Sequence, residues 1–271
     1  MSLKLDLAGK VAIVTGSSRG LGKAIALALA RAGADLVITS RTRQSLLPVQ
    51  QEIEAIGGRV LPIELDVGQQ ASIRAMADEV LRTWHRVDIL VNNAGMNIRK
   101  PALELTWEEW DAVLDTNLKG VFFCAQAVAP TMIQKKWGRI INIGSATNIM
   151  AYPNINAYCA SRGGVLQLTK SLAAEWGPYG ITVNVLAAGW FQTEQTRVLW
   201  ENPQWNEMMA DRIPAGRIGK PDELGPAAVY LASEEAAYVN GMLFMMDGGF
   251  TTGGVKNTVP IKKEKYPDES R

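Results

Sequence analysis

The sequence predicts an α/β fold: one doubly wound domain with about seven parallel strands and helices on both faces of the sheet. Short apolar runs alternate with helical patterns along the chain, which is typical of a parallel sheet with helical crossovers. The first apolar run leads directly into a glycine-rich turn and a helix. The predicted strands cover residues 11–15, 35–39, 60–66, 88–92, 139–144, 181–187 and 242–246.

The beginning of the chain predicts a dinucleotide site. The buried strand V-A-I-V at 11–14 is followed by the turn T-G-S-S-R-G-L-G at 15–22. Glycines in this turn permit a tight bend and close approach of phosphate oxygens to backbone N–H groups. The helix that follows has an apolar face formed by Leu21, Ile25, Ala28 and Leu29. Gly33 is placed to end this helix, which completes a Rossmann-type strand, turn and helix.

The end of the second strand indicates which nicotinamide dinucleotide binds. An acid at this position binds the ribose 2′-hydroxyl, whereas arginine accommodates a 2′-phosphate. The strand D-L-V-I-T-S ends without an acid and is followed by Arg41, and Arg19 in the turn adds a second cation. We therefore expect NADP, with NAD less favoured. In the alternative interpretation, Arg41 and Arg43 are only solvated loop charges.

The stretch from 140 to 162 carries the predicted chemistry. An apolar strand breaks at Ser145, Tyr158 follows thirteen residues later, and Arg162 stands four residues beyond it. If Tyr158 opens a helix, this spacing puts Arg162 on the same face, where its charge can favour the phenolate. These groups suit proton transfer to a carbonyl. Alternatively, Ser145 only caps a turn, and Tyr158 and Arg162 form a surface pair.

From about Leu7 to Gly249 the chain resembles the classical short-chain dehydrogenase/reductases. The matching motifs are T-G-S-S-R-G-L-G, Asp66-Val67, N-N-A-G at 92–95, Asn117, Ser145, Tyr158 and A-G-W-F-Q-T ending at Thr193. Two residues depart from the family pattern. Arg162 stands where the family has lysine, and Ala188 stands where a proline precedes Gly189.

The resemblance implies the site residues. The catalytic residues would be Asn117, Ser145, Tyr158 and Arg162. The cofactor-binding residues would be Gly16, Ser18, Arg19, Gly20, Leu21, Gly22, Arg41, Asp66, Val67, Asn93, Ala94, Gly95, Tyr158, Arg162, Gly189 and Thr193. Asp66 would contact the adenine edge and Thr193 the carboxamide. Because arginine is planar and essentially never deprotonated, Arg162 would keep a charge near Tyr158 but impair a proton relay through its side chain.

The segment N-I-R-K-P at 97–101 resembles the gluconate 5-dehydrogenase branch of the family. This resemblance implies a sugar-acid substrate whose carboxylate meets Arg99, while Ser145 and Tyr158 hold the reacting oxygen. A 3-oxoacyl-thioester reductase, similar over the same motifs, is the alternative. A third possibility is an inactive NADP-binding sensor or scaffold, suggested by Arg162, although a non-catalytic protein needs neither Ser145, Tyr158 nor Asn117.

Composition limits the other possibilities. A chain of 271 residues with 47% apolar and 20% charged residues suits one domain over 1–250, with a lid at about 190–215 and a tail at 251–271. The net charge of +1 argues against nucleic acid as a partner. The sequence has neither an apolar signal core nor a run of about 18 apolar residues, so we expect a cytoplasmic protein without membrane contact.

Metal chemistry is also not expected. The single histidine, His85, precedes the fourth strand, and Cys124 and Cys159 have no metal-type spacing. We therefore predict a small-molecule substrate and no metal. The family resemblance further implies a homo-oligomer, a tetramer or dimer, assembled through the helices at about 107–134 and 156–176.

Overall fold

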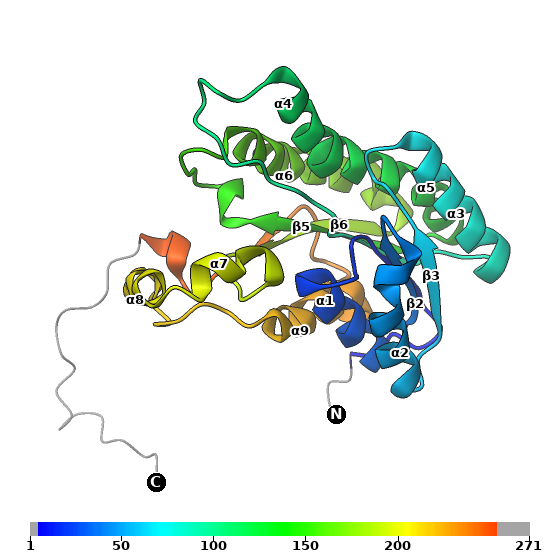
Figure 1. Cartoon of the computed structure of the whole chain (residues 1–271). Coiled ribbons are helices and arrows are strands. Elements are labelled where there is room, and N and C mark those ends of the chain that lie inside the picture. The colour runs from blue at the N-terminus through cyan, green and yellow to red at the C-terminus, as the bar shows by residue number, and fades with distance from the viewer. Residues whose placement is uncertain (1–4, 254–271) are drawn as a thin grey trace, which may run out of the picture.

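A computed structural model describes residues 5–253, in which seven strands form one parallel sheet with the order β3-β2-β1-β4-β5-β6-β7 (Figure 1). The strands are β1 (Val11–Val14), β2 (Asp35–Ser40), β3 (Val60–Glu64), β4 (Ile89–Asn92), β5 (Gly138–Ser145), β6 (Ile181–Ala188) and β7 (Leu243–Met246). Every strand ends within two residues of its predicted bounds. The predicted fold class is confirmed.

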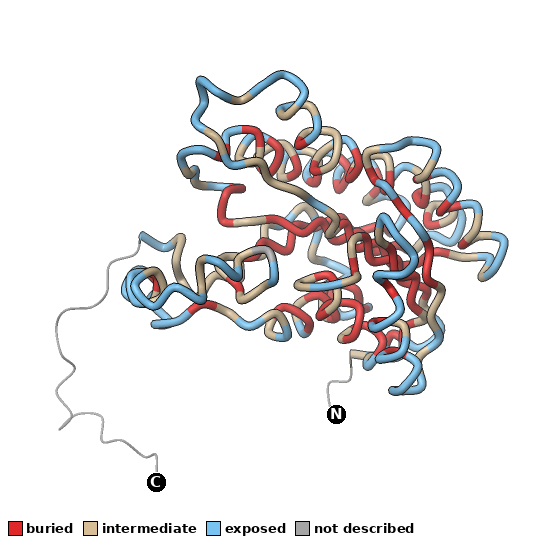
Figure 2. Tube along the Cα trace, viewed as in Figure 1, coloured by how far each residue is buried: buried red, intermediate tan, exposed pale blue. Residues whose placement is uncertain are grey.

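Helices cover both faces of the sheet, as Figure 1 shows. One face carries α1 (Gly20–Arg31), α2 (Leu47–Ala55) and α9 (Gly225–Ala232). The other carries α3 (Gln70–Trp84), α5 (Gly120–Lys135) and α6 (Asn156–Trp176), with α4 (Trp107–Leu114) beside α6. The central strands are among the most deeply buried segments (Figure 2). Their continuous apolar runs follow from this burial on both faces.

The order of the strands determines where a ligand can bind. The chain builds β1, β2 and β3 outward in one direction, then returns to add β4 on the other side of β1. In such sheets the crevice lies outside the carboxyl ends of the strands, at this point of reversal. The glycine turn follows β1 and the N-N-A-G motif begins with the last residue of β4, so both motifs lie at this crevice.

The segment after β6 folds into two short helices, α7 (Arg197–Trp200) and α8 (Pro203–Arg212). They have a small apolar core of their own, formed by Met209, Ile213 and Ile218 with Trp190, Trp200, Trp205 and Phe250 packed against it. Of the tail predicted at 251–271, residues beyond 253 lie outside the described part. Within residues 5–253, the structure has no helix with the length and apolar character needed to cross a membrane.

Candidate functional site

The glycine-rich turn closes tightly against the end of β4. The Asn93 side chain donates to the carbonyls of Thr15 and Gly16, both at 2.9 Å. The Thr15 hydroxyl accepts the N–H groups of Asn93 and Ala94, also at 2.9 Å. Gly16 has a φ of +62°, and a Cβ on Gly22 would lie 2.3 Å from the Asn93 Nδ2 atom. Only glycine fits these two positions.

The N-terminus of α1 is suited to a phosphate group. Its N-cap residue, Arg19, makes no side-chain capping bond, and the first turn contains no acidic residue. The first N–H groups of the helix therefore keep their capacity to bind an anion, which the positive end of the helix dipole also favours. The residues present fit the pyrophosphate of a dinucleotide.

The predicted 2′-phosphate cations lie at the corner where the turn meets β2. The Ser17 hydroxyl accepts the N–H of Thr39 at 2.9 Å, which ties the turn to the strand that precedes Arg41. Arg19 and Arg41 are both exposed, and neither forms an ion pair within the described residues.

Asp66, predicted to contact the adenine edge, follows β3 by two residues. Its carboxylate accepts the N–H of Gly68 at 2.9 Å.

Asn117 connects the end of β4 to helix α6. It is buried in a π-helical turn, Asp115–Lys119, a type of irregularity that is frequent at functional sites. Its side chain accepts the N–H of Met96 and donates to the carbonyl of the same residue, both at 2.8 Å. Its Nδ2 also donates to the Ser161 hydroxyl at 3.2 Å, which in turn donates to the Tyr158 carbonyl at 2.7 Å.

Arg162 is buried beside Tyr158, with only 5% of its surface exposed. Its guanidinium carbon lies 4.9 Å from the centre of the Tyr158 ring, and its Nη1 donates to the Ile143 carbonyl at 2.8 Å. A Cβ on Gly95 would lie 2.8 Å from its Nη2, so the guanidinium lies close against the backbone of residue 95. The two side chains share a helix face as predicted, and the alternative of a surface pair is wrong.

Ser145 ends β5 and begins a short turn. Its Oγ accepts the N–H of Thr147 at 3.2 Å, so this serine caps the turn, as the alternative interpretation expects, whether or not it also binds a substrate. Its own N–H donates to the Asn148 side chain at 2.7 Å. Asn148 in turn donates to the Arg162 carbonyl at 2.6 Å. Ser145 and the helix that carries Tyr158 are thus joined through one amide side chain.

Thr193 lies opposite the glycine turn. A Cβ on Gly20 would lie 3.7 Å from the Thr193 Cβ, which brings the predicted pyrophosphate and carboxamide residues to one crevice. The Trp200 indole donates to the Thr193 carbonyl at 3.0 Å and so links α7 to this residue. Gly189, directly after β6, donates its N–H to the carbonyl of Met246, the last residue of β7, at 2.9 Å.

Aromatic side chains join the segment at 190–215 to the loop between Ser145 and Tyr158. Tyr152 on this loop packs edge to face against Trp190 at 5.9 Å and stacks on Phe250 at 6.4 Å. Trp190 packs against Trp205 of α8 at 5.1 Å. Burial raises the pKa of Tyr152, an effect that a hydrogen bond from Trp190 partly offsets.

Arg99, predicted to meet the substrate, is exposed, and the described residues give it no contact with Ser145 or Tyr158. Its neighbour Lys100 donates its N–H to the Asn154 carbonyl at 2.9 Å, so this segment runs beside the loop that precedes Tyr158.

Val67, one of the predicted cofactor residues, packs closely on Gly120. A Cβ on Gly120 would lie 2.7 Å from the Val67 carbonyl oxygen.

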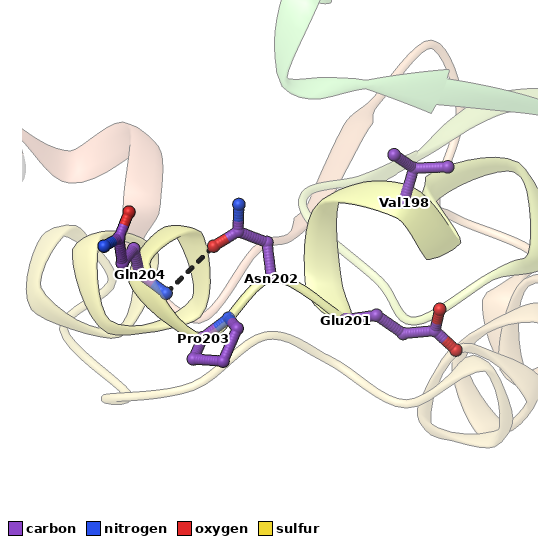
Figure 3. Close-up of a pocket in the computed structure, with 5 residues that line it drawn as sticks. All are labelled: Val198, Glu201, Asn202, Pro203 and Gln204. Carbon is purple, nitrogen blue, oxygen red and sulfur yellow. Dashed lines mark hydrogen bonds between the residues drawn. The ribbon is translucent and has the colours of Figure 1, made fainter.

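A hollow on the surface between α7 and α8 is lined by Val198, Glu201, Asn202, Pro203 and Gln204 (Figure 3). Asn202 caps α8 here, accepting the N–H of Gln204 at 3.0 Å. No predicted catalytic or cofactor residue lines this hollow. We therefore place the candidate site at the carboxyl ends of the strands and not in this hollow.

Two residues of the network, Asn148 and Ser161, are not among those predicted from the sequence. Two signals were available in the sequence. The spacing S-x-x-N at 145–148 is that of a capping box, and Ser161 follows Tyr158 at the i+3 spacing of one helix face.

His85 is exposed and ends α3 in a left-handed conformation. Among the described residues, no group of three His, Cys, Asp or Glu residues could hold a metal ion.

The chain matches a protein-family model and is similar to known proteins over most of its length. A family model described as enoyl-(acyl carrier protein) reductase matches residues 16–251. The gluconate 5-dehydrogenase of Gluconobacter oxydans is 41% identical over 246 residues, which cover 91% of this chain and 96% of that one. The 3-oxoacyl-(acyl carrier protein) reductase of Thermotoga maritima is 38% identical over 245 residues, or 90% and 99% of the two chains.

Among solved structures, the fold is similar to a gluconate 5-dehydrogenase from Burkholderia cenocepacia in complex with NADP and tartrate. The TM-score is 0.88 and the identity 40%, with 92% of this chain and 98% of that chain covered. The likeness thus extends over nearly the whole domain. The chain belongs to the short-chain dehydrogenase/reductase family of NAD(P)(H)-dependent oxidoreductases.

Proposed function

We propose that this protein is an NADP-preferring dehydrogenase/reductase that interconverts a secondary alcohol and a ketone on a sugar acid. The observation that carries the proposal is the network at the strand ends. Asn117 and Ser161 link the end of β4 to Tyr158, and Asn148 links Ser145 to the same helix. A site that only binds a nucleotide has no need of a buried network around a serine and a tyrosine.

Each side chain has a proposed part in the reaction. NADP(H), when bound, supplies or accepts the hydride. Ser145 holds the substrate oxygen, and Tyr158 gives its phenolic proton to the forming alkoxide in reduction or removes it in oxidation. The guanidinium of Arg162 favours the phenolate that remains. Asn117 organises the water through which Tyr158 regains its proton.

Arg162 is expected to slow this reaction. Its Nη1 is bonded to the Ile143 carbonyl, and its Nη2 lies against Gly95. A guanidinium held in this way supplies charge, but it cannot release a proton as an ammonium group can. Its buried Nε has no hydrogen-bond partner within the described structure.

NADP preference is supported by Arg19 and Arg41. Both are exposed at one corner of the glycine turn and free of ion pairs within the described residues. A 2′-phosphate there would receive charge-assisted bonds from two cations, whereas the 2′-hydroxyl of NAD would find no acid. The Burkholderia cenocepacia relative binds NADP in its crystal structure.

The sugar-acid substrate is supported by Arg99 and by relatives. Arg99 lies one residue before Lys100, which is bonded to the loop leading to Tyr158. Its exposed guanidinium can therefore reach a carboxylate at the entrance to the crevice. Relatives named as gluconate 5-dehydrogenase and 2-dehydro-3-deoxy-D-gluconate 5-dehydrogenase are 41% and 38% identical to this chain.

A 3-oxoacyl-thioester reductase is the second candidate, and the aromatic cluster favours it. Tyr152, Trp190, Trp205 and Phe250 present a largely apolar wall that suits an acyl chain. In either case we propose that residues 190–215 act as a lid over the substrate. A catalytically impaired NADP sensor is the third candidate, because Arg162 replaces the family lysine.

We also propose a homo-oligomer, a tetramer or dimer, assembled through α4, α5 and α6. A groove between α4, the π-helical turn, α5 and α6 is lined by Leu114, Leu118, Phe122, Gly164 and Leu168, together with Asp115 and Lys119. Burial of such a groove against a second copy is favourable at about 25 cal/mol per Å². Light scattering during gel filtration would measure the mass, and a monomer at micromolar concentration would contradict this proposal.

The decisive experiment is a substrate panel. Sugar acids, neutral polyols and 3-oxoacyl thioesters would be assayed in both directions with NADP(H) and NAD(H), following nicotinamide absorbance. Turnover of a sugar acid with NADP supports the main proposal. Turnover of thioesters alone supports the second candidate, and NADP binding without any turnover supports the third.

A further inference from the structure

Asn148 bridges the strand that ends in Ser145 and the helix that carries Tyr158. It is buried, with 8% of its surface exposed. Its Oδ1 accepts the N–H of Ser145 at 2.7 Å, and its Nδ2 donates to the Arg162 carbonyl at 2.6 Å. Ser145 and Arg162 are seventeen positions apart in the chain. A single amide group therefore connects two parts of the site that belong to different elements.

The surrounding structure makes room for this amide. A Cβ on Gly144 would lie 2.3 Å from the Asn148 Oδ1, so a side chain at 144 would displace it. A second bond runs parallel to the first, from Nη1 of Arg162 to the Ile143 carbonyl at 2.8 Å. The last residues of β5 are thus fastened to residue 162 of α6 at two points.

We infer that Asn148 is a positioning residue that fixes the Ser145 hydroxyl relative to the Tyr158 hydroxyl. The inference rests on the proposed function. Both hydroxyls must reach one substrate oxygen within hydrogen-bond distance, and a displacement of about 1 Å can cost about 100-fold in rate. Asparagine suits this position because it both accepts from Ser145 and donates to Arg162, which aspartate, when ionised, cannot do.

The test compares Asn148→Ala with a matched control, Asn184→Ala. Asn184 is 1% exposed on β6 and forms an equivalent bridge outside the site. Its Oδ1 accepts the Met242 N–H at 3.0 Å, and its Nδ2 donates to the Val239 carbonyl at 2.7 Å. Both variants should lose thermal stability, because each loses two buried hydrogen bonds. Only Asn148→Ala should lose kcat, by about tenfold or more, with the Kd of NADPH unchanged. Equal kcat values for the two variants would overturn the inference.

Asn148→Asp provides a second variant of the same shape. A neutral carboxylic acid can accept and donate, whereas the carboxylate can only accept. The kcat of this variant should therefore approach the wild-type value at low pH and fall as the carboxylate ionises. The wild-type profile, measured in parallel, is the reference. A profile for Asn148→Asp that parallels the wild type throughout would count against the bridge.

Hydrogen exchange tests the bridge without turnover. The Ser145 amide is protected by Asn148, so the peptide that contains residues 143–150 should exchange faster in Asn148→Ala but not in Asn184→Ala. Unchanged exchange would overturn the inference. If the wild-type protein turns over no substrate in the panel, the proposed function fails while this measurement still decides whether Asn148 holds Ser145.

Discussion

The guanidinium of Arg162 lies over the ring of Tyr158, 4.9 Å from its centre, and donates to the Ile143 carbonyl at 2.8 Å. A cation at this distance from an aromatic ring interacts favourably with it. The charge that a phenolate requires is therefore present in the site. What differs from the family pattern is the side chain that carries this charge.

This relationship makes Arg162→Lys the most informative substitution. Lysine supplies a compact ammonium that can pass protons onward, so turnover should rise by roughly tenfold, since positioned proton transfer contributes about 10²–10⁴-fold and the arginine keeps part of that role. Tyr158→Phe should abolish turnover in either background. Steady-state kcat measured against pH for both forms decides the matter. If the lysine variant is no faster and its pH profile is unchanged, Arg162 is a native adaptation. A lysine variant as inactive as Tyr158→Phe would indicate a non-catalytic protein.

Arg41→Ala should weaken NADP(H) binding and leave NAD(H) binding nearly unchanged. The loss should be about 2 kcal/mol, within the range for hydrogen bonds to charged groups. Fluorescence titration of both cofactors measures it. Arg74→Ala, on the exposed side of α3, is the control for a general change in charge. Equal dissociation constants of the wild type for NADPH and NADH would contradict the proposed preference.

Arg99→Ala should raise the KM of a sugar acid far more than that of a neutral polyol. The exposed guanidinium can pair only with a substrate that carries a negative charge. The expected increase is about tenfold or more for the acid, because a lost charge-assisted bond costs about 1.5–3 kcal/mol. Arg99→Lys keeps the charge and should restore part of the difference. An equal effect on both substrates would favour the thioester reductase.

The two cysteines should differ in reactivity. Complete burial raises the pKa of the Cys124 thiol to about 12, so it stays neutral and shielded at pH 8. Cys159 is only half-buried. Iodoacetamide at pH 8 should therefore label Cys159 first, and Cys124 only after unfolding, as peptide mass spectrometry would show. Labelling of Cys124 in the native protein would mean that the core around α5 opens.

Glu223 should make stability depend on pH in the acid range. Its ion pair with Arg217 and a backbone N–H lower its pKa from 4.5 to about 2. The stabilisation is therefore fully present above pH 4.5, and it is lost as the pH falls through the folded value near 2. Because the pair is exposed and screened by solvent, the effect should be small.

Thermal unfolding of Glu223→Gln from pH 7 to pH 2 measures this contribution. The variant should melt slightly below the wild type at pH 7, and the difference should disappear toward pH 2. Glu64→Gln, an exposed glutamate on β3, is the control. A difference that persists unchanged at the lowest pH would mean that the glutamate stabilises the fold by a means other than its charge.

The α/β architecture follows from local signals in the sequence. Apolar runs such as Val11–Val14 are long enough for a strand buried on both faces, and the turn at 15–22 can only be built with glycine. The i, i+4 spacing of Tyr158 and Arg162 placed the two side chains on one helix face. These features depend on residues that are close in the chain, so their geometry is determined by the backbone periodicity.

The tertiary structure decided which distant residues meet. Asn148 reaches Arg162 because α6 packs against the turn that follows β5, and Asn117 reaches Ser161 because the π-helical turn before α5 packs against α6. No periodicity encodes these contacts, since each depends on the relative positions of separate elements. The burial of Arg162 beside Gly95 is of the same kind. The sequence determined which groups the site contains, and the packing of the elements determined how they are held together.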